Sequence, residues 1–125
     1  METKTIHIGE AELAIMKVLW RAGEPVNTAY INRAVEEKQW KRTTVSTFLT
    51  RLVDKGAIGC EKRGNQYYYA PTLSEEAYRR MQTGHLITNL YNGSVKDLAA
   101  ALFAQTSLSE EDMRELKAII DGREV

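Results

Sequence analysis

The sequence predicts a mainly α-helical protein that carries one small β-hairpin. Apolar residues recur at helical spacing in several segments along the chain. Between residues 57 and 70 this spacing gives way to two short segments, the second rich in tyrosine, that are typical of strands. The length of 125 residues allows one domain of ordinary size, or a small domain with an appendage.

Three helices are expected in the first 55 residues. The first covers residues 10–21 and carries an apolar stripe. The second begins after Asn27 or Thr28, either of which can cap it, and runs to about Lys38. The third covers residues 43–55. Its inner face follows the pattern i, i+3, i+4, i+7, and the residues on that face are Val45, Phe48, Leu49 and Leu52.

A hairpin follows the third helix. Residues 57–62 and 66–70 are the two strand candidates, and residues 63–65 (Arg-Gly-Asn) are typical of the turn between them. Three helices followed by a hairpin within about 70 residues is the order of elements in a winged helix-turn-helix domain. We therefore expect residues 1–71 to form such a domain, which ends at Pro71.

The remaining residues, 72–125, predict three more helices. Ser74 can cap a helix that runs to about Tyr91, Ser94 can cap a fifth helix, and Ser109 a sixth. In the sixth helix Asp112 stands at the position that completes a capping box.

These C-terminal helices carry more apolar surface than three helices can bury among themselves. A second copy of the same helices would cover it, so we expect a symmetric homodimer. The alternative is that the helices fold back on the first domain. The residues expected at the dimer contact are Leu98, Leu102, Met113, Leu116, Ile119 and Ile120.

The net charge of the chain is zero, from 17 basic and 17 acidic residues, but it is unevenly distributed. Residues 38–63 hold seven basic and two acidic residues, a net charge of +5. Residues 105–125 hold three basic and six acidic residues, a net charge of −3. The basic block is either a solvated charged surface or a contact for nucleic acid.

The third helix favours DNA contact. Its outward positions are rich in hydroxyl and basic side chains, whereas ordinary surface helices are more often rich in Glu and Lys. Short Ser and Thr side chains let a helix enter a major groove and bond to phosphates or base edges. At the hairpin tip, Lys62 and Arg63 would reach the flanking backbone or minor groove, unless they simply form a polar turn. The predicted DNA-binding residues are Arg42, Thr43, Thr44, Ser46, Thr47, Thr50, Arg51, Lys62 and Arg63.

No motif supports an enzyme, a metal site or a cofactor. His7 and His85 are far apart, and Cys60 is the only cysteine. No apolar run is long enough to span a membrane, and residues 1–9 lack the apolar stretch of a signal peptide. We therefore expect a cytoplasmic protein that is not inserted in the membrane, with no enzymatic activity, no cofactor and no metal.

Several segments, in this order, resemble the BlaI/MecI/CopY family of bacterial repressors, over roughly residues 6–121. The segments are AELAIMKVLW, TVSTFLTRLVDKGAI, YYYAP, NGSVKDLAAALF and LSEEDMRELKAII. The resemblance implies a homodimeric repressor of resistance-type genes, mainly those for β-lactamases and penicillin-binding proteins, that binds an inverted-repeat operator. It implies DNA contacts by Thr43, Thr44 and Ser46, a backbone contact by Arg51, and a wing that includes Lys62 and Arg63.

The resemblance also implies relief of repression by cleavage in the fifth helix, after a membrane-bound sensor protease detects the drug. The matching bond is Ala101–Leu102, where the family's best-known site is Asn–Phe. A proline common near the start of the family's recognition helix is Arg42 here. The cysteine-rich metal site of the copper-responsive branch has no counterpart in residues 105–125. The alternatives are a family repressor of another operon with another inducer, and a winged-helix protein–protein adaptor.

Overall fold

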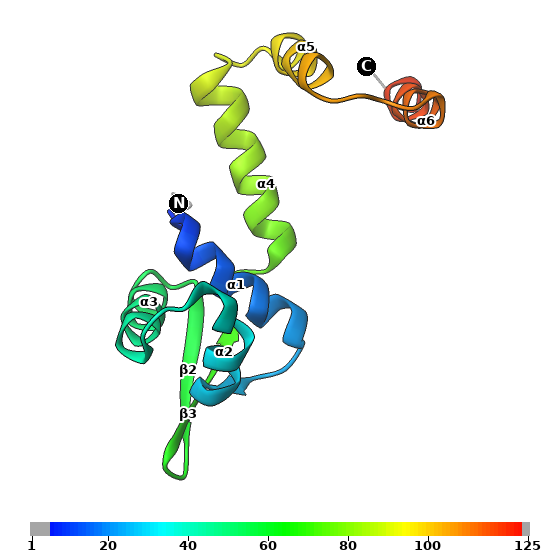
Figure 1. The fold of residues 1–125 in the computed structure, drawn as a ribbon. Coiled ribbons are helices and arrows are strands. Elements are labelled where there is room, and N and C mark those ends of the chain that lie inside the picture. The colour runs from blue at the N-terminus through cyan, green and yellow to red at the C-terminus, as the bar shows by residue number, and fades with distance from the viewer. Residues whose placement is uncertain (1–5, 124–125) are drawn as a thin grey trace. The chain divides into compact units, whose positions relative to one another are not determined.

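The computed structural model describes residues 6–123 and divides into two compact units, with the division between Met81 and Gln82. The division falls inside helix α4 (Glu75–His85). Figure 1 shows the order of the elements along the chain. All three strands lie in the first unit, whereas the last two helices lie in the second.

The helices of the first unit begin and end close to the residues that the sequence indicated. α1 (Glu10–Ala22) ends at Gly23, whose φ of 72° is the left-handed conformation that glycine adopts at helix ends. α2 (Thr28–Ala34) is capped by Asn27, whose side chain accepts a hydrogen bond from the backbone N–H of Tyr30 at 2.9 Å. α3 covers Arg42–Asp54.

The second helix is shorter than predicted. α2 ends at Ala34, because Val35 leaves the helical angles, and a separate 3-10 turn, η1 (Glu36–Lys38), follows it. The prediction of one helix to Lys38 is therefore wrong in its last turn. Apolar spacing marks which residues face the core, but it does not distinguish α-helical from 3-10 hydrogen bonding over so few residues.

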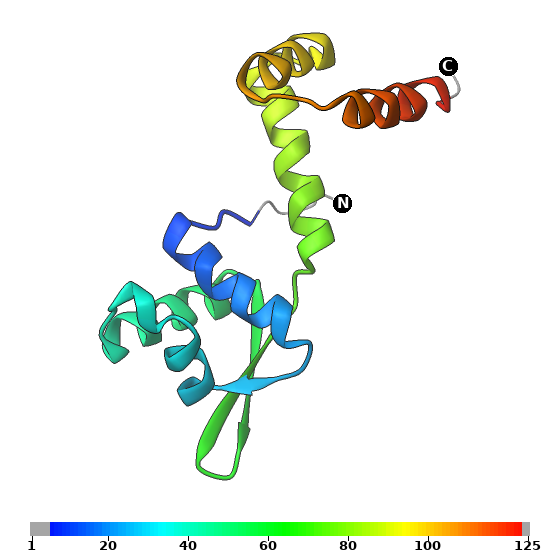
Figure 2. The same cartoon turned by 45° about the vertical axis from the view of Figure 1, so that its right-hand side comes forward.

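The sheet has three antiparallel strands rather than the predicted two. β2 (Ile58–Arg63) pairs with β3 (Gln66–Pro71), and the two-residue strand β1 (Val26–Asn27) pairs with the other edge of β3. A two-residue strand has no alternating pattern that a sequence could show. β1 ties the start of α2 to the hairpin, which extends beyond the helices of its unit (Figure 2).

The first unit has one hydrophobic core. α1, α2 and α3 all contribute side chains that are fully buried, and Ala57 and Ile58, which follow α3, complete the core. Trp20 lies at its edge, where its indole N–H donates to the carbonyl of Leu73 at 2.9 Å and its ring meets that of Tyr78. The buried apolar residues are Ile8, Ile15, Met16, Leu19, Val26, Ile31, Val35, Val45, Leu49, Leu52, Ala57 and Ile58.

The C-terminal helices follow the predicted order, with one correction. α4 ends at His85 and a π-helical turn, η2 (Leu86–Leu90), continues the chain, so the single helix predicted to Tyr91 is wrong. An i→i+5 turn keeps the residues wound, which is why the sequence pattern did not separate it from α4. α5 (Val95–Gln105) is capped by Ser94, as predicted.

The sixth helix, α6 (Glu110–Asp121), begins as the sequence indicated. The Ser109 hydroxyl accepts from the backbone N–H of Asp112 at 3.0 Å, and the Asp112 carboxylate accepts from the N–H of Ser109 at 3.3 Å. This is the predicted capping box. Unlike the first unit, α5 and α6 bury no residue fully in the single chain.

Candidate nucleic-acid interface

Helix α3 has one face in the core and one face in solvent. Val45, Leu49 and Leu52 are buried, and they anchor the helix to α1 and to the sheet. The opposite face carries the predicted DNA-binding side chains. Among them Thr44 is half-buried, and the exposed ones are Arg42, Thr43, Ser46, Thr47, Thr50 and Arg51. The face is therefore polar, basic and free of long side chains between its two ends.

The N-terminus of α3 has a feature that the sequence pattern did not predict. The residue at its N-cap is Lys41, which provides no side-chain acceptor for the first-turn N–H groups. Ser, Thr, Asp or Asn would be usual at that position. The first-turn N–H groups of α3 have no side-chain cap, and Lys41 and Arg42 add positive charge beside them. This end of the helix is therefore suited to bind a phosphate oxygen. The signal in the sequence was a lysine at a cap position within the basic block.

Thr47 is already engaged within the helix. Its hydroxyl donates to the backbone carbonyl of Thr43 at 2.9 Å. In this arrangement its oxygen is left as an acceptor and its methyl group is left for apolar contact, so Thr47 is suited to base edges rather than to phosphates.

The wing carries two cations at its tip. Lys62 and Arg63 are exposed at the end of β2, next to the turn at Gly64, whose φ is 61°. In the register of the hairpin Lys62 lies opposite Tyr67. The Lys62 ammonium lies 5.7 Å from the centre of the Tyr67 ring, and the Arg63 guanidinium lies 4.8 Å from that of Tyr68. Both cations therefore rest against aromatic rings.

Helix α3 and the hairpin adjoin each other. A shallow hollow of about 170 Å³ lies between them and is lined by Thr50, Val53 and Asp54 of α3 and by Cys60 and Tyr69 of the hairpin. Burial, and then the neighbouring Cys60 thiol, raise the pKa of the Tyr69 phenol. Tyr69 is therefore neutral at physiological pH, as its position beside the core requires.

Asn27 braces the wing against the first helix of the helix-turn-helix. Its oxygen caps α2, while its amide nitrogen donates to the side-chain oxygen of Gln66 at 2.7 Å. One side chain thus uses its acceptor and its donor to connect the start of α2 to the hairpin.

A partly buried ion pair fixes the far end of α3. The Lys55 ammonium lies 2.5 Å from the Glu12 carboxylate of α1, and that oxygen also accepts from the backbone N–H of Gly9 at 2.8 Å. Burial raises the pKa of the Glu12 carboxyl, but the Lys55 and Gly9 hydrogen bonds and the charges of Lys55 and Arg51 more than offset this, so its pKa lies below the ordinary value. Glu12 is therefore ionised, and it anchors the last turn of the helix that carries Arg51.

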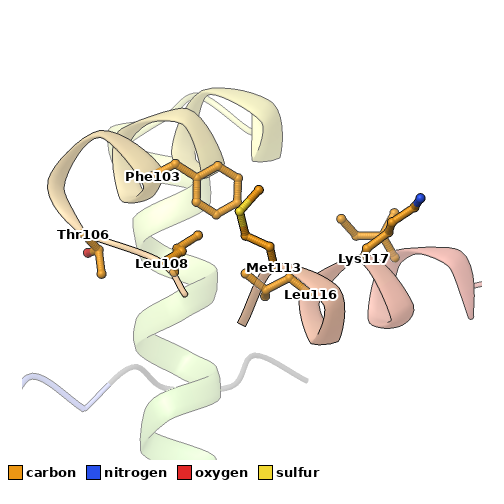
Figure 3. A pocket seen from close by; sticks show the side chains of 7 residues that line it. Phe103, Thr106, Leu108, Met113, Leu116 and Lys117 are labelled. Carbon is orange, nitrogen blue, oxygen red and sulfur yellow. The ribbon is translucent and has the colours of Figure 1, made fainter. Parts of the chain in front are cut away.

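The second unit contains an apolar hollow of about 420 Å³ between α5 and α6 (Figure 3). Phe103 and Met113 point toward each other across it, with Leu116 beside them. The predicted dimer residues lie on these two helices. Leu98 and Leu116 are half-buried, and the strongly exposed ones are Leu102 (53%), Met113 (59%), Ile119 (64%) and Ile120 (67%).

Comparison with known proteins identifies the family. The sequence profile of the penicillinase repressor family matches residues 8–122. The chain belongs to this family. Members of the penicillinase repressor family are DNA-binding transcriptional repressors rather than enzymes, so the predicted class of protein is confirmed.

Individual relatives agree with the family. The chain is 29% identical to the penicillinase repressor of Bacillus licheniformis over 118 residues, which cover 94% of this chain and 92% of the relative. It is 26% identical to the methicillin resistance regulatory protein MecI of Staphylococcus aureus strain N315 over 123 residues, 98% of this chain and all of the relative.

Two solved structures are similar to the chain. The DNA-binding domain of the repressor BlaI is 33% identical and covers 62% of this chain, with a TM-score of 0.54. The monomeric form of Bacillus licheniformis BlaI in complex with the blaP half-operator is 35% identical and covers 61% of this chain, with a TM-score of 0.52. In each case 94% of the solved chain is matched. The predicted fold class, a winged helix with a further helical region, is confirmed.

The described residues show no candidate metal site and no candidate membrane-spanning helix. Within residues 6–123, no group of three or more His, Cys, Asp or Glu side chains is arranged to hold a metal ion. Over the same residues, no helix is long and apolar enough to cross a membrane.

Proposed function

We propose that this repressor acts as a homodimer on an inverted-repeat operator and controls a resistance-type operon, with β-lactamase or penicillin-binding-protein genes as its targets. In this proposal residues 1–71 bind DNA and residues 72–125 dimerise. The observation that carries the proposal is the exposed face of α3, where hydroxyl side chains lie between basic residues at both ends. The half-operator complex of a related repressor supports it.

Each protomer would insert α3 into the major groove. Thr43, Thr44, Ser46, Thr47 and Thr50 would meet base edges and nearby phosphates. The remaining predicted contacts are cationic and would neutralise phosphates, which gives affinity without sequence preference. They are Arg42 and Arg51 on α3 and Lys62 and Arg63 on the wing.

Dimerisation is proposed to use α5 and α6. The exposed apolar side chains on these helices include Phe103 and Ile120. In the single chain, no residue of α5 or α6 is buried. An exposed apolar patch of this kind is typical of a protein contact. A second copy of the same helices fits it, because a two-fold axis pairs each patch with an identical one.

Relief of repression is proposed to come from cleavage at Ala101–Leu102 by a membrane-bound sensor protease. This bond lies inside α5, and the Leu102 side chain is 53% exposed. A protease would have to unwind the helix locally before cutting it, since helical backbone groups already bond to each other. Cleavage there would detach the end of α5 and all of α6, and with them every predicted dimer residue except Leu98. Mass spectrometry of the chain from cells exposed to a β-lactam tests this step; an intact chain during full induction would contradict it.

A second candidate is a family repressor that answers to another inducer. It is favoured by one observation, the Ala–Leu pair at the bond where the family's best-known site has Asn–Phe. The gene next to this one separates the two candidates, because a sensor protease there supports induction by cleavage.

Footprinting of the chain's own upstream region tests the proposed function. With excess random-sequence competitor, we expect two protected half-sites whose centres are separated by whole turns of the DNA helix. Absence of any protected site, or a single protection without two-fold symmetry, would contradict the proposal.

A further inference from the structure

The wing holds its two cations in an unusual arrangement. Side chains of successive strand residues point to opposite faces of a sheet, so Lys62 and Arg63 leave the hairpin on opposite sides. Each meets a tyrosine of β3 on its own side. Lys62 lies over Tyr67, its partner in the register, and Arg63 lies over Tyr68, which pairs with the residue before Lys62.

Tyr67 and Tyr68 lie outside the hydrophobic core, so core packing does not explain these two aromatic rings. Tyr67 is 48% exposed and Tyr68 is half-buried, although neither belongs to the core of the unit. A high strand propensity explains an aromatic residue at such a position. It does not explain why both rings have a cation of the wing tip against them, one on each face of the hairpin.

A ring changes what a cation loses on binding. Lys and Arg side chains have many rotamers, and fixing them against a phosphate costs conformational entropy. A cation that already rests on a ring has lost part of that freedom before DNA arrives. It also keeps its outer side open to a second partner, because the ring covers only one side of it.

Arg63 has a competing partner in the free protein. Its guanidinium lies 3.4 Å from the Glu61 carboxylate, and both side chains are exposed. A phosphate can replace this carboxylate, since the two oxygen groups bind a guanidinium in the same way. The Tyr68 ring does not compete with the phosphate, so it can hold Arg63 throughout the exchange.

We propose that Tyr67 and Tyr68 are positioning residues that hold Lys62 and Arg63 on the two faces of the wing, ready for DNA phosphates on both sides of the hairpin. This inference rests on the proposed function, because it requires the wing to contact the operator. Neither tyrosine is assigned a contact with DNA. Each acts through the cation that it carries.

The experiment compares leucine and phenylalanine at each tyrosine. Tyr67→Leu and Tyr68→Leu remove the ring, whereas Tyr67→Phe and Tyr68→Phe keep it. Binding to the footprinted operator fragment is measured by fluorescence anisotropy at several salt concentrations. We expect each leucine variant to lose affinity by about two- to fivefold, and each phenylalanine variant to bind like the wild type. The slope of log affinity against log salt stays unchanged, because no phosphate contact is removed.

A spectroscopic readout checks the placement without DNA. In the wild type and in Tyr67→Phe, we expect the ring to shift the NMR signals of the Lys62 side-chain protons near the ammonium upfield. In Tyr67→Leu they return to ordinary lysine values. Ordinary values already in the folded wild type would overturn the inference, whatever the binding data show.

Arg63→Ala distinguishes a failure of this inference from a failure of the proposed function. If it weakens binding and lowers the salt slope, while both leucine variants bind as tightly as the wild type, the inference fails and the proposed function stands. If it changes nothing while Arg51→Ala weakens binding, the wing makes no contact and the inference fails again. If the wild type binds no operator, the proposed function itself fails.

Discussion

Removal of the Lys55 charge is expected to destabilise the first unit more than its half-exposed position suggests. Lys55→Met keeps the aliphatic stem and deletes the ammonium. The Glu12 carboxylate then stays behind with its side chain 7% exposed and with its second oxygen, Oε2, already lacking a hydrogen-bond partner. A buried charge that has lost its partner is strongly unfavourable.

The magnitude follows from the exposure of each partner. Removing one member of a fully buried pair costs about 3–5 kcal/mol. The Lys55 side chain is 32% exposed, so water reaches part of this site and we expect about 2–3 kcal/mol. Glu12→Gln should cost less, about 1–2 kcal/mol. The glutamine oxygen still accepts from the Gly9 N–H, and the lysine that remains can turn to solvent.

The pH dependence of unfolding provides a second, independent test of the ion pair. In the wild type the folded-state pKa of Glu12 is lowered, so its stabilising contribution is present at neutral pH and is lost as the pH falls through that pKa. In Lys55→Met the pKa-raising effect of burial is no longer offset by the lysine, so protonation of Glu12 relieves the strain. The difference in unfolding free energy between Lys55→Met and the wild type should therefore shrink between pH 7 and pH 4.

Urea unfolding followed by circular dichroism measures these free energies. Lys17→Met is the matched control, because Lys17 is exposed on α1 and should change stability by less than about 0.5 kcal/mol. Equal stability of Lys55→Met and Lys17→Met at pH 7 would show that the ion pair does not stabilise the unit. A difference in unfolding free energy between Lys55→Met and the wild type that widens as the pH falls would show the same.

Three further predictions concern the dimer, the wing and a helix cap. Ile120→Asp should convert the dimer to monomers in sedimentation experiments, because this apolar side chain is 67% exposed in the single chain. Arg114→Asp on the same helix is the control and should leave the dimer intact. An unchanged mass for Ile120→Asp would contradict this prediction. Glu61→Gln should tighten operator binding about two- to fivefold by freeing Arg63, and weaker binding in an anisotropy titration argues against it. Ser109→Ala should destabilise α6 by about 1 kcal/mol in thermal unfolding, and no change would show that the cap is dispensable.

Much of the first unit could be predicted because its local signals agree with its packing. Apolar spacing predicted α3, and the same residues fill the core. Asn27 was one of two predicted caps of α2, and it is the residue that caps it. The hairpin followed from a change of period and a glycine at the turn. In each case the information lies within a few residues of the element.

What the sequence did not predict depends on contacts between distant segments. Strand β1 exists because two residues before α2 pair with β3, about forty residues away, and two residues carry no pattern of their own. The Glu12–Lys55 pair joins the start of α1 to the end of α3. The placement of the wing cations over Tyr67 and Tyr68 depends on the register of the hairpin, which composition alone does not fix.

We propose that α3 binds DNA through its exposed face, and removing the Arg51 charge is the sharpest test of this role. The measurement is the salt dependence of affinity for the footprinted operator, compared among the wild type, Arg51→Ala and Arg21→Ala. Arg21 is an exposed arginine on α1, so its loss changes the net charge equally without touching α3. We predict that Arg51→Ala lowers the slope of log affinity against log salt by about one for each protomer bound, and that Arg21→Ala leaves the slope unchanged. Equal slopes for Arg51→Ala and the wild type, or equal losses of affinity from Arg51→Ala and Arg21→Ala, would show that the exposed face of α3 does not bind DNA.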